Sequence, residues 1–188
     1  MSPKIASKNG EQEAILEVAK LMQVAARTAP KTAGIDDIIT LVVYGKEKEG
    51  IAEKMREIAN ERNIDGFRRD AKNVDDSDAV LLIGVRGNKS IGINCGACGF
   101  KNCKELEDSM KKAGQDFIGS TCVFKALDLG IALGSAVKIA DILNVDNRIM
   151  YRIGTAALKL NLMPEATVAM GVPLSAKGKN IYFDRKWP

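Results

Sequence analysis

The residues of this chain best suited to chemistry are its four cysteines, which all fall in one short stretch. They are Cys95, Cys98, Cys103 and Cys122, in the spacing C-x2-C-x4-C-x18-C. Gly96 and Gly99 lie between the first three and supply the positive-φ turns that a tight loop needs. Four thiolates around one centre can hold a [4Fe–4S] cluster or a structural zinc ion. The chain has no histidine, which excludes zinc sites of mixed cysteine and histidine.

The spacing favours an iron–sulfur cluster over two other interpretations, a structural zinc site and disulfides or unliganded thiols. Zinc sites usually contain two pairs of ligands, as in C-x2-C-x15–20-C-x2-C. Here three ligands are local and one is remote, which is how many cubane clusters are held. We therefore predict an iron–sulfur binding insertion at residues 92–122, with a [4Fe–4S] cluster on the four cysteines.

The same stretch resembles a known cluster-binding domain. Cys95-Gly-Ala-Cys98-Gly, followed by Cys103 and then by Cys122, resembles the small four-iron domain of corrinoid iron–sulfur proteins and of electron-transport complexes in anaerobes. The resemblance covers about thirty residues, and the gap before Cys122 is slightly longer here. It implies that all four cysteines are cluster ligands.

Length and composition indicate one globular domain and argue against a nucleic-acid binder. With 188 residues and 46% hydrophobic content, the chain can fill one core, so we predict a single domain over residues 1–188. The net charge of +4 is spread along the chain, and only 5% of the residues are aromatic. No basic run alternates with aromatic residues, so we expect no nucleic-acid binding.

No segment has the pattern expected for secretion or membrane insertion. Residues 1–10 lack the apolar core of a signal peptide. The most apolar region, residues 126–145, carries Asp128, Lys138 and Asp141, which argues against a membrane span. Four thiols without a secretion signal predict a reducing, cytoplasmic location.

The apolar pattern predicts the elements that must position the cysteines. Helices are predicted at residues 11–27, 48–62, 105–113, 124–143 and 150–160, with a short polar helix and loop at 63–78. Strands are predicted at residues 38–44, 79–85 and 167–172. This mixed order predicts an α+β fold in which helices cover a sheet.

A second resemblance spans most of the chain. Its segments are Val-Ala-Ala-Arg-Thr-Ala-Pro at 24–30, Asp-Ala-Val-Leu-Leu-Ile-Gly at 78–84, Ala-Leu-Asp-Leu-Gly-Ile-Ala at 126–132 and Ala-Met-Gly-Val-Pro at 169–173. They resemble parts of the flavin-dependent nitroreductase fold, and the whole chain resembles a family of uncharacterised proteins containing a ferredoxin domain. The resemblance implies a sandwich of a mainly antiparallel sheet covered by helices, with the cysteine-rich loop inserted. It also implies a homodimer with FMN at the subunit interface.

The residues that hold the flavin in nitroreductases are partly replaced in this chain. The N-terminal Arg-Arg-Ser segment is missing, Lys31 stands where the motif has serine, and Gly34 stands where it has asparagine. The predicted substitutes, as donors to the flavin phosphate, are Arg27, Lys31, Lys177 and Lys179. A compact anion needs only a few cations and N–H groups. The alternative for each of these residues is a solvated surface charge.

Three functions are compatible with the sequence. The favoured one is a redox protein whose cluster passes single electrons, between an unknown redox partner protein and a flavin in the same dimer. The second is a structural or binding module in which the metal, iron–sulfur or zinc, only stabilises the fold of residues 94–122 and takes part in no reaction. The third is an FMN-dependent, nitroreductase-like oxidoreductase. The sequence has no histidine for a catalytic triad, no Walker-type phosphate loop and no G-x-G-x-x-G fingerprint.

Overall fold

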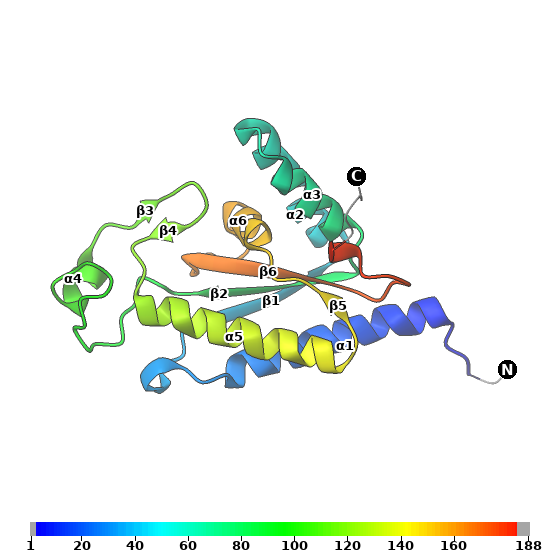
Figure 1. The fold of residues 1–188 in the computed structure, drawn as a ribbon, viewed down its shortest axis with the longest axis horizontal. Coiled ribbons are helices and arrows are strands. Elements are labelled where there is room, and N and C mark those ends of the chain that lie inside the picture. The colour runs from blue at the N-terminus through cyan, green and yellow to red at the C-terminus, as the bar shows by residue number, and fades with distance from the viewer. Residues whose placement is uncertain (1–2, 184–188) are drawn as a thin grey trace.

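An antiparallel sheet of four strands lies between two layers of helices (Figure 1). The computed structural model describes residues 3–183. The strands are β1 (Ile38–Tyr44), β2 (Ala79–Val85), β5 (Asp146–Asn147) and β6 (Val168–Ser175), in the order β1-β2-β6-β5. The main helices are α1 (Ser7–Thr28), α2 (Gly45–Arg62), α3 (Asp65–Asp75), α5 (Val123–Ile142) and α6 (Tyr151–Lys159). This arrangement confirms the predicted α+β sandwich of an antiparallel sheet covered by helices.

Strand β2 is the centre of the molecule, and all seven of its residues are buried. Successive side chains of a strand point to opposite faces of the sheet. Leu81 and Ile83 belong to the core beneath α1 and α5, whereas Val80 and Leu82 belong to the core beneath α2, α3 and α6. The unbroken apolar run that predicts this strand is therefore explained by burial on both faces.

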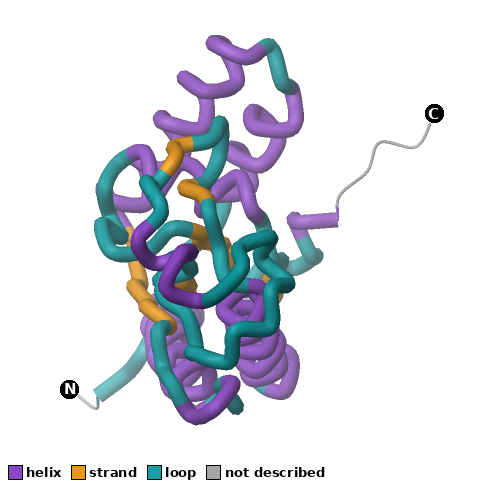
Figure 2. Tube along the Cα trace, turned by 90° about the vertical axis from the view of Figure 1, so that its left-hand side faces the viewer, coloured by secondary structure: helices purple, strands orange, loops and turns teal. Residues whose placement is uncertain are grey.

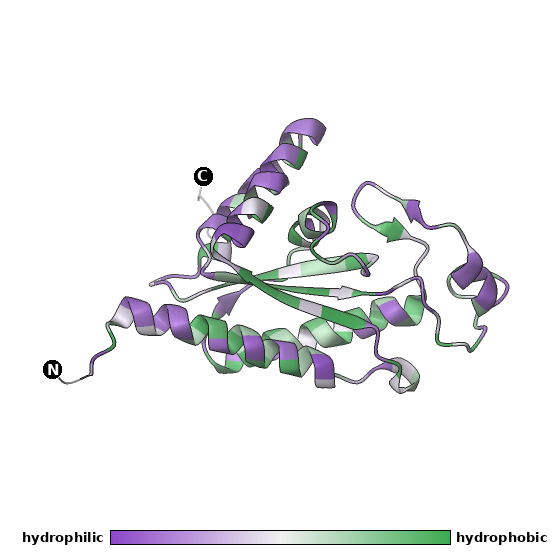
Figure 3. Cartoon of the chain, turned by 180° about the vertical axis from the view of Figure 1, so that it is seen from behind, coloured by the Kyte–Doolittle hydropathy of each residue, from purple (hydrophilic) through white to green (hydrophobic). Residues whose placement is uncertain are grey.

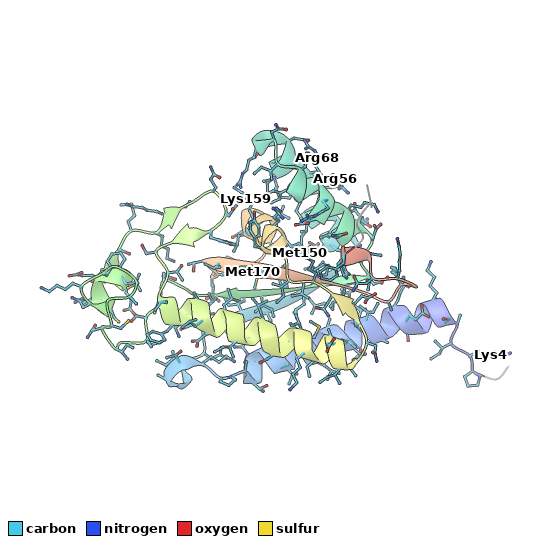
Figure 4. The ribbon with its side chains drawn as sticks, viewed as in Figure 1. Lys4, Arg56, Arg68, Met150, Lys159 and Met170 are labelled. Atoms are coloured by element: carbon cyan, nitrogen blue, oxygen red, sulfur yellow. The ribbon has the colours of Figure 1, made fainter. Side chains whose placement is uncertain are left out.

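The two helix layers differ in their outer surfaces. Figure 3 shows that α2 and α3 are largely hydrophilic, and Figure 4 shows Arg56 and Arg68 on their outer side. On the other layer, where α1 packs against α5, large apolar side chains are exposed. They are Leu21, Val24, Leu127 and Ile131, which we call the α1/α5 outer face. This face is apolar and lies uncovered in the described part of a single chain.

The strands predicted at residues 38–44 and 79–85 are confirmed residue for residue. The helix predicted at residues 105–113 is wrong in its bounds, because the observed helix α4 (Cys103–Asp108) begins earlier and ends sooner. The side chain of Asn102 accepts a hydrogen bond from the N–H of Glu105 and so fixes the earlier start. Two short strands then follow, β3 (Lys112–Ala113) and β4 (Ile118–Gly119). They and β5 were not predicted, because two residues show no alternation.

The segment between β2 and α5, which carries α4, β3 and β4, projects beyond one end of the sheet (Figure 1). Figure 2 looks onto this end and shows the segment mostly as loop. The N–H of Cys122 donates to the carbonyl oxygen of Gly87 at 2.7 Å. The guanidinium of Arg62 on α2 pairs with the carboxylate of Asp116 at 2.6 Å. These contacts fix the cysteine-bearing segment against the sheet and the helices.

Within residues 3–183, no helix combines the length and the apolar character that a membrane span requires. Helix α5, in the most apolar region of the sequence, buries the charged side chains of Lys125 and Asp128.

Candidate metal centre

The four cysteines line one pocket between the projecting segment and the start of α5. The other residues on its walls are Ile91, Ile93, Gly96, Asn102, Leu106, Val123 and Phe124. Between these walls, about 290 Å³ is free of protein atoms, and this space includes open solvent. Cys95 is exposed, Cys98 and Cys103 are half-buried, and Cys122 is buried with 4% of its surface accessible. The fold thus brings all four predicted ligands to one pocket, although Cys122 is remote from the others in sequence.

Cys103 is held from both sides by Asn94. The side-chain oxygen of Asn94 accepts a hydrogen bond from the N–H of Cys103 at 2.8 Å. In return, the N–H of Asn94 donates to Sγ of Cys103 at 3.3 Å. This donor is the main cause that lowers the pKa of the Cys103 thiol, and Ser90 and Gly92 add to the effect. Asn94 thereby stabilises the thiolate form, which is the form that binds iron.

A second set of hydrogen bonds, between Ser90 and Glu107, joins the two ends of the cysteine loop a few residues outside Asn94 and Cys103. The N–H and hydroxyl of Ser90 both donate to Oε1 of Glu107, at 2.9 and 2.7 Å. These bonds lower the pKa of the Glu107 carboxyl, because they stabilise its charged form. The loop between Ser90 and Glu107 is therefore closed by protein hydrogen bonds as well as by any metal.

Cys122 has a different environment, because it directly precedes the twenty residues of α5. Its N–H is bonded to Gly87, in the turn that follows β2, so its backbone is part of the rigid body of the fold. The positive end of the helix dipole of α5 lies at this position. Cys122 thus anchors one wall of the pocket to the core, while the other three cysteines belong to the projecting loop.

The donor set suits an iron–sulfur cluster. All four side chains are thiols, the ligands that such clusters take, and apolar side chains stand between them. Each thiolate of a [4Fe–4S] cluster binds a different iron atom, so the ligands surround the cluster and need not converge on one point. In residues 3–183, no group of three or more cysteine, aspartate or glutamate side chains is arranged to hold a single metal ion.

Sequence reasoning missed a buried charge pair near the start of α5. The fully buried Nζ of Lys125, one turn after Cys122, donates to the carbonyl of Ile35 at 3.0 Å. The same ammonium pairs with the carboxylate of Asp37 at 2.9 Å. The signal in the sequence is a lysine inside the most apolar helix, where an unpaired charge would be too costly. The pair holds the start of α5 against the segment that leads into β1.

The two predicted flavin-phosphate cations near the end of α1 already have partners. The guanidinium of Arg27 pairs with the carboxylate of Asp36. The ammonium of Lys31, with only 6% of its side chain exposed, donates to the carbonyl oxygens of Ala26 at 2.9 Å and of Arg27. Burial lowers the pKa of Lys31, and the nearby Asp36 partly offsets this effect. Both cations therefore stabilise the turn that follows α1.

The other two predicted cations lie at the opposite end of the sheet. Lys177 pairs with Asp78 at 3.2 Å, and Asp78 directly precedes β2, whereas Asp36 lies beside the far end of that strand. The seven residues of β2 separate the two ends by roughly 20 Å. Lys179 follows Lys177 closely in the chain. Binding of one phosphate by all four residues would require two chains, and this assignment stays a prediction.

A family model described as "uncharacterized protein containing a ferredoxin domain" (DUF2148) matches residues 118–185. The matched region includes Cys122 and α5 but not the other three cysteines. An uncharacterized protein from Archaeoglobus fulgidus is 51% identical to this chain over 178 residues, which is 95% of both proteins. This second match covers nearly the whole chain.

Solved structures of similar fold are nitroreductases and flavoproteins. Nitroreductase CinD from Lactococcus lactis, in complex with nicotinic acid, has a TM-score of 0.58 at 12% identity, covering 89% of this chain and 79% of that one. A candidate nitroreductase from Desulfovibrio desulfuricans, in complex with FMN, has a TM-score of 0.55 at 12% identity, covering 99% and 83%. A BluB-like flavoprotein from Clostridium difficile has a TM-score of 0.54 at 15% identity, covering 100% and 88%. At these identities the likeness is one of fold, and it confirms the predicted nitroreductase-like architecture.

Proposed function

Because this chain belongs to the family of uncharacterized proteins containing a ferredoxin domain, we propose that it is an iron–sulfur redox protein that transfers single electrons. The observation that carries the proposal is that all four cysteines line one pocket. Thiolates from a local loop and from one remote position are the usual way of holding a four-iron cluster.

Each part of the pocket has a role in this proposal. Cys95, Cys98, Cys103 and Cys122 would hold a [4Fe–4S] cluster, which supplies one-electron chemistry when bound. The apolar walls, among them Leu106 and Phe124, exclude water from the buried side. In this proposal a partner protein would approach from the side of Cys95, which is exposed. The protein therefore sets position, burial and hydrogen bonding, and these set the reduction potential.

Protein purified without oxygen is expected to contain about four iron and four sulfide per chain and to show a broad brown absorption shoulder. Four thiolates supply one ligand to each iron atom, which is the reason for this stoichiometry. The measurement is iron, zinc and acid-labile sulfide analysis together with an absorption spectrum. Stoichiometric zinc in protein from iron-replete cells would contradict the cluster and favour the structural-staple function.

FMN is a second candidate cofactor, supported by a fold shared with an FMN-bound protein from Desulfovibrio desulfuricans. A yellow protein with two absorption bands, in place of or beside the brown shoulder, would identify it. Arg27 and Lys31 are held by Asp36 and by the end of α1, so a flavin phosphate would have to compete with these contacts. The cluster is therefore the better supported cofactor, and the nitroreductase-like oxidoreductase is the alternative function.

A homodimer is proposed on the basis of the α1/α5 outer face. Its four side chains are exposed in one chain, and a Cβ added at Gly130 or Gly134 of α5 would meet no atom within 4 Å. A second copy packed on this face would cover apolar surface and could approach closely at the two glycines. An obligate dimer of this kind buries more than about 2,000 Å² in total. We also propose that this dimer lies in the cytoplasm and exchanges electrons with a redox partner protein.

The change Ile131→Asp is expected to convert the dimer into a monomer, because it places a charge in the middle of the apolar contact. Light scattering at micromolar concentration would report twice the 20.3 kDa chain mass for the wild type and the single mass for the variant. Met110→Asp is the matched control, because Met110 is exposed in the projecting segment, away from α1 and α5. A wild-type protein with the mass of one chain would refute the dimer.

A further inference from the structure

Asn94 is the residue immediately before the first cysteine, and its contacts reach across the loop to the third. Its side-chain oxygen holds the N–H of Cys103 at 2.8 Å, and its own N–H points to Sγ of Cys103 at 3.3 Å. One residue thus fixes both the backbone and the sulfur atom of Cys103. Within residues 3–183, no N–H or O–H group donates a hydrogen bond to the sulfur atom of Cys95, Cys98 or Cys122, so Cys103 differs from the other cysteines.

The backbone of Asn94 makes this double contact possible. Its φ is 52°, in the left-handed region that only glycine, asparagine and aspartate adopt readily. Asparagine combines this backbone preference with a short side chain that carries an acceptor oxygen. Glycine would supply only the first property, and alanine would supply neither.

We infer that Asn94 is a positioning residue for the cluster, holding Cys103 in place as a ligand and donating to its sulfur. This inference rests on the proposed function, since it presupposes that the thiolates bind an iron–sulfur cluster. Hydrogen bonds to cluster sulfurs are one of the means by which a protein sets reduction potential. The reduced cluster carries one more negative charge than the oxidised one, so an N–H donor stabilises the reduced form more. Asn94 therefore raises the potential and slows cluster loss.

Three substitutions separate the two properties of Asn94. Asn94→Asp keeps the acceptor oxygen and tolerates the left-handed backbone. Asn94→Gly keeps the backbone but loses the acceptor. Asn94→Ala loses the acceptor and strains the backbone. Asn63→Ala is the matched control, because Asn63 is also exposed and has a φ of 53°, but it lies at the end of α2, remote in sequence from the cysteines.

The first measurement uses the metal-free, reduced protein and follows hydrogen exchange of the Cys103 amide. Loss of its acceptor in Asn94→Gly and Asn94→Ala is expected to speed this exchange about fivefold, the effect of one typical hydrogen bond. Asn94→Asp and the control Asn63→Ala are expected to exchange at the wild-type rate. The second measurement uses anaerobically loaded protein and follows the rate of iron loss to a chelator and the midpoint potential. The Gly and Ala variants are expected to lose iron several-fold faster, because the N–H of Cys103 loses its side-chain acceptor. All variants keep the main-chain N–H that donates to the sulfur, so the potential is expected to become more negative in Asn94→Ala, whose backbone is strained, and to change little in Asn94→Gly.

The results discriminate among the possible roles. If Asn94→Gly matches the wild type in both the exchange rate and the rate of iron loss, Asn94 serves only the turn and the inference is overturned. If Asn94→Ala behaves like Asn63→Ala, the inference is overturned as well, while the cluster itself still stands. A wild-type chain that takes up no iron and sulfide would refute the proposed function, and the cluster role of Asn94 with it. The exchange rates of the metal-free protein would then still show whether Asn94 holds Cys103.

Discussion

Replacing Cys98 with serine is expected to abolish cluster assembly, lowering the iron content from about four atoms per chain to nearly none. Cys98 is the middle thiol of the local set of three, and its side chain is half-buried in the pocket. Without it the loop offers only two local thiolates, too few to capture iron before the remote Cys122 joins. Iron and sulfide analysis after anaerobic reconstitution measures the effect.

Cys122→Ser should be measured beside Cys98→Ser, because it removes the remote thiolate and leaves all three local thiolates in place. It is expected to give a folded protein with a three-iron or labile cluster. The hydrogen bond from residue 122 to Gly87 is made by the main chain and does not need the sulfur. If Cys122→Ser keeps a full cluster and unchanged stability, Cys122 is not a ligand. The fourth iron would then be open to water or substrate, which would favour a catalytic cluster over an electron relay.

Neither cysteine change is expected to unfold the sheet. The apolar faces of β1 and β2 pack against helices of the body, and the projecting segment contributes little to either core. Far-UV circular dichroism of both variants should therefore match the wild type. Loss of the sheet signal in Cys98→Ser would show that the loop is part of the folding unit.

The cysteine pocket and the main elements could be predicted because their signals are local. Runs of β-branched residues identify β1 and β2, and the spacing of three cysteines identifies the loop. Asn94 could not be predicted as a partner of Cys103, because its role depends on a left-handed backbone and on two hydrogen bonds formed only after the loop closes. Sequence spacing does not report either feature.

The candidate flavin cations show a second limit of sequence reasoning. Arg27 and Lys31 lie close in sequence, as do Lys177 and Lys179, but nothing in the sequence tells which end of the sheet each pair occupies. That depends on the antiparallel pairing of β1, β2 and β6, which places Asp36 and Asp78 at opposite ends of β2. The two pairs of cations, which the sequence alone would allow to share one phosphate, are therefore separated by the length of the sheet.

The contact between α6 and β6 gives the largest expected effect on stability. Gly154 of α6 lies so close to β6 that an added Cβ would be 1.8 Å from the carbonyl oxygen of Ala169 and 2.3 Å from its carbonyl carbon. Both are backbone atoms of an inner strand, so they cannot move aside without disturbing the sheet. Gly154→Ala is therefore expected to lower the free energy of unfolding by about 3 kcal/mol, the upper range for overpacking a core.

Gly50→Ala is the matched control for this prediction, because Gly50 lies inside α2 and an added Cβ would meet no atom within 4 Å. Alanine is the better helix former there, so this change is expected to raise the free energy of unfolding by about 0.5–1 kcal/mol. Urea unfolding of reduced, metal-free protein, at one protein concentration for all variants, measures both effects. The opposite signs separate the close approach at Gly154 from the general effect of replacing a helical glycine. A Gly154→Ala protein as stable as the wild type would mean that α6 does not pack on β6 at this distance.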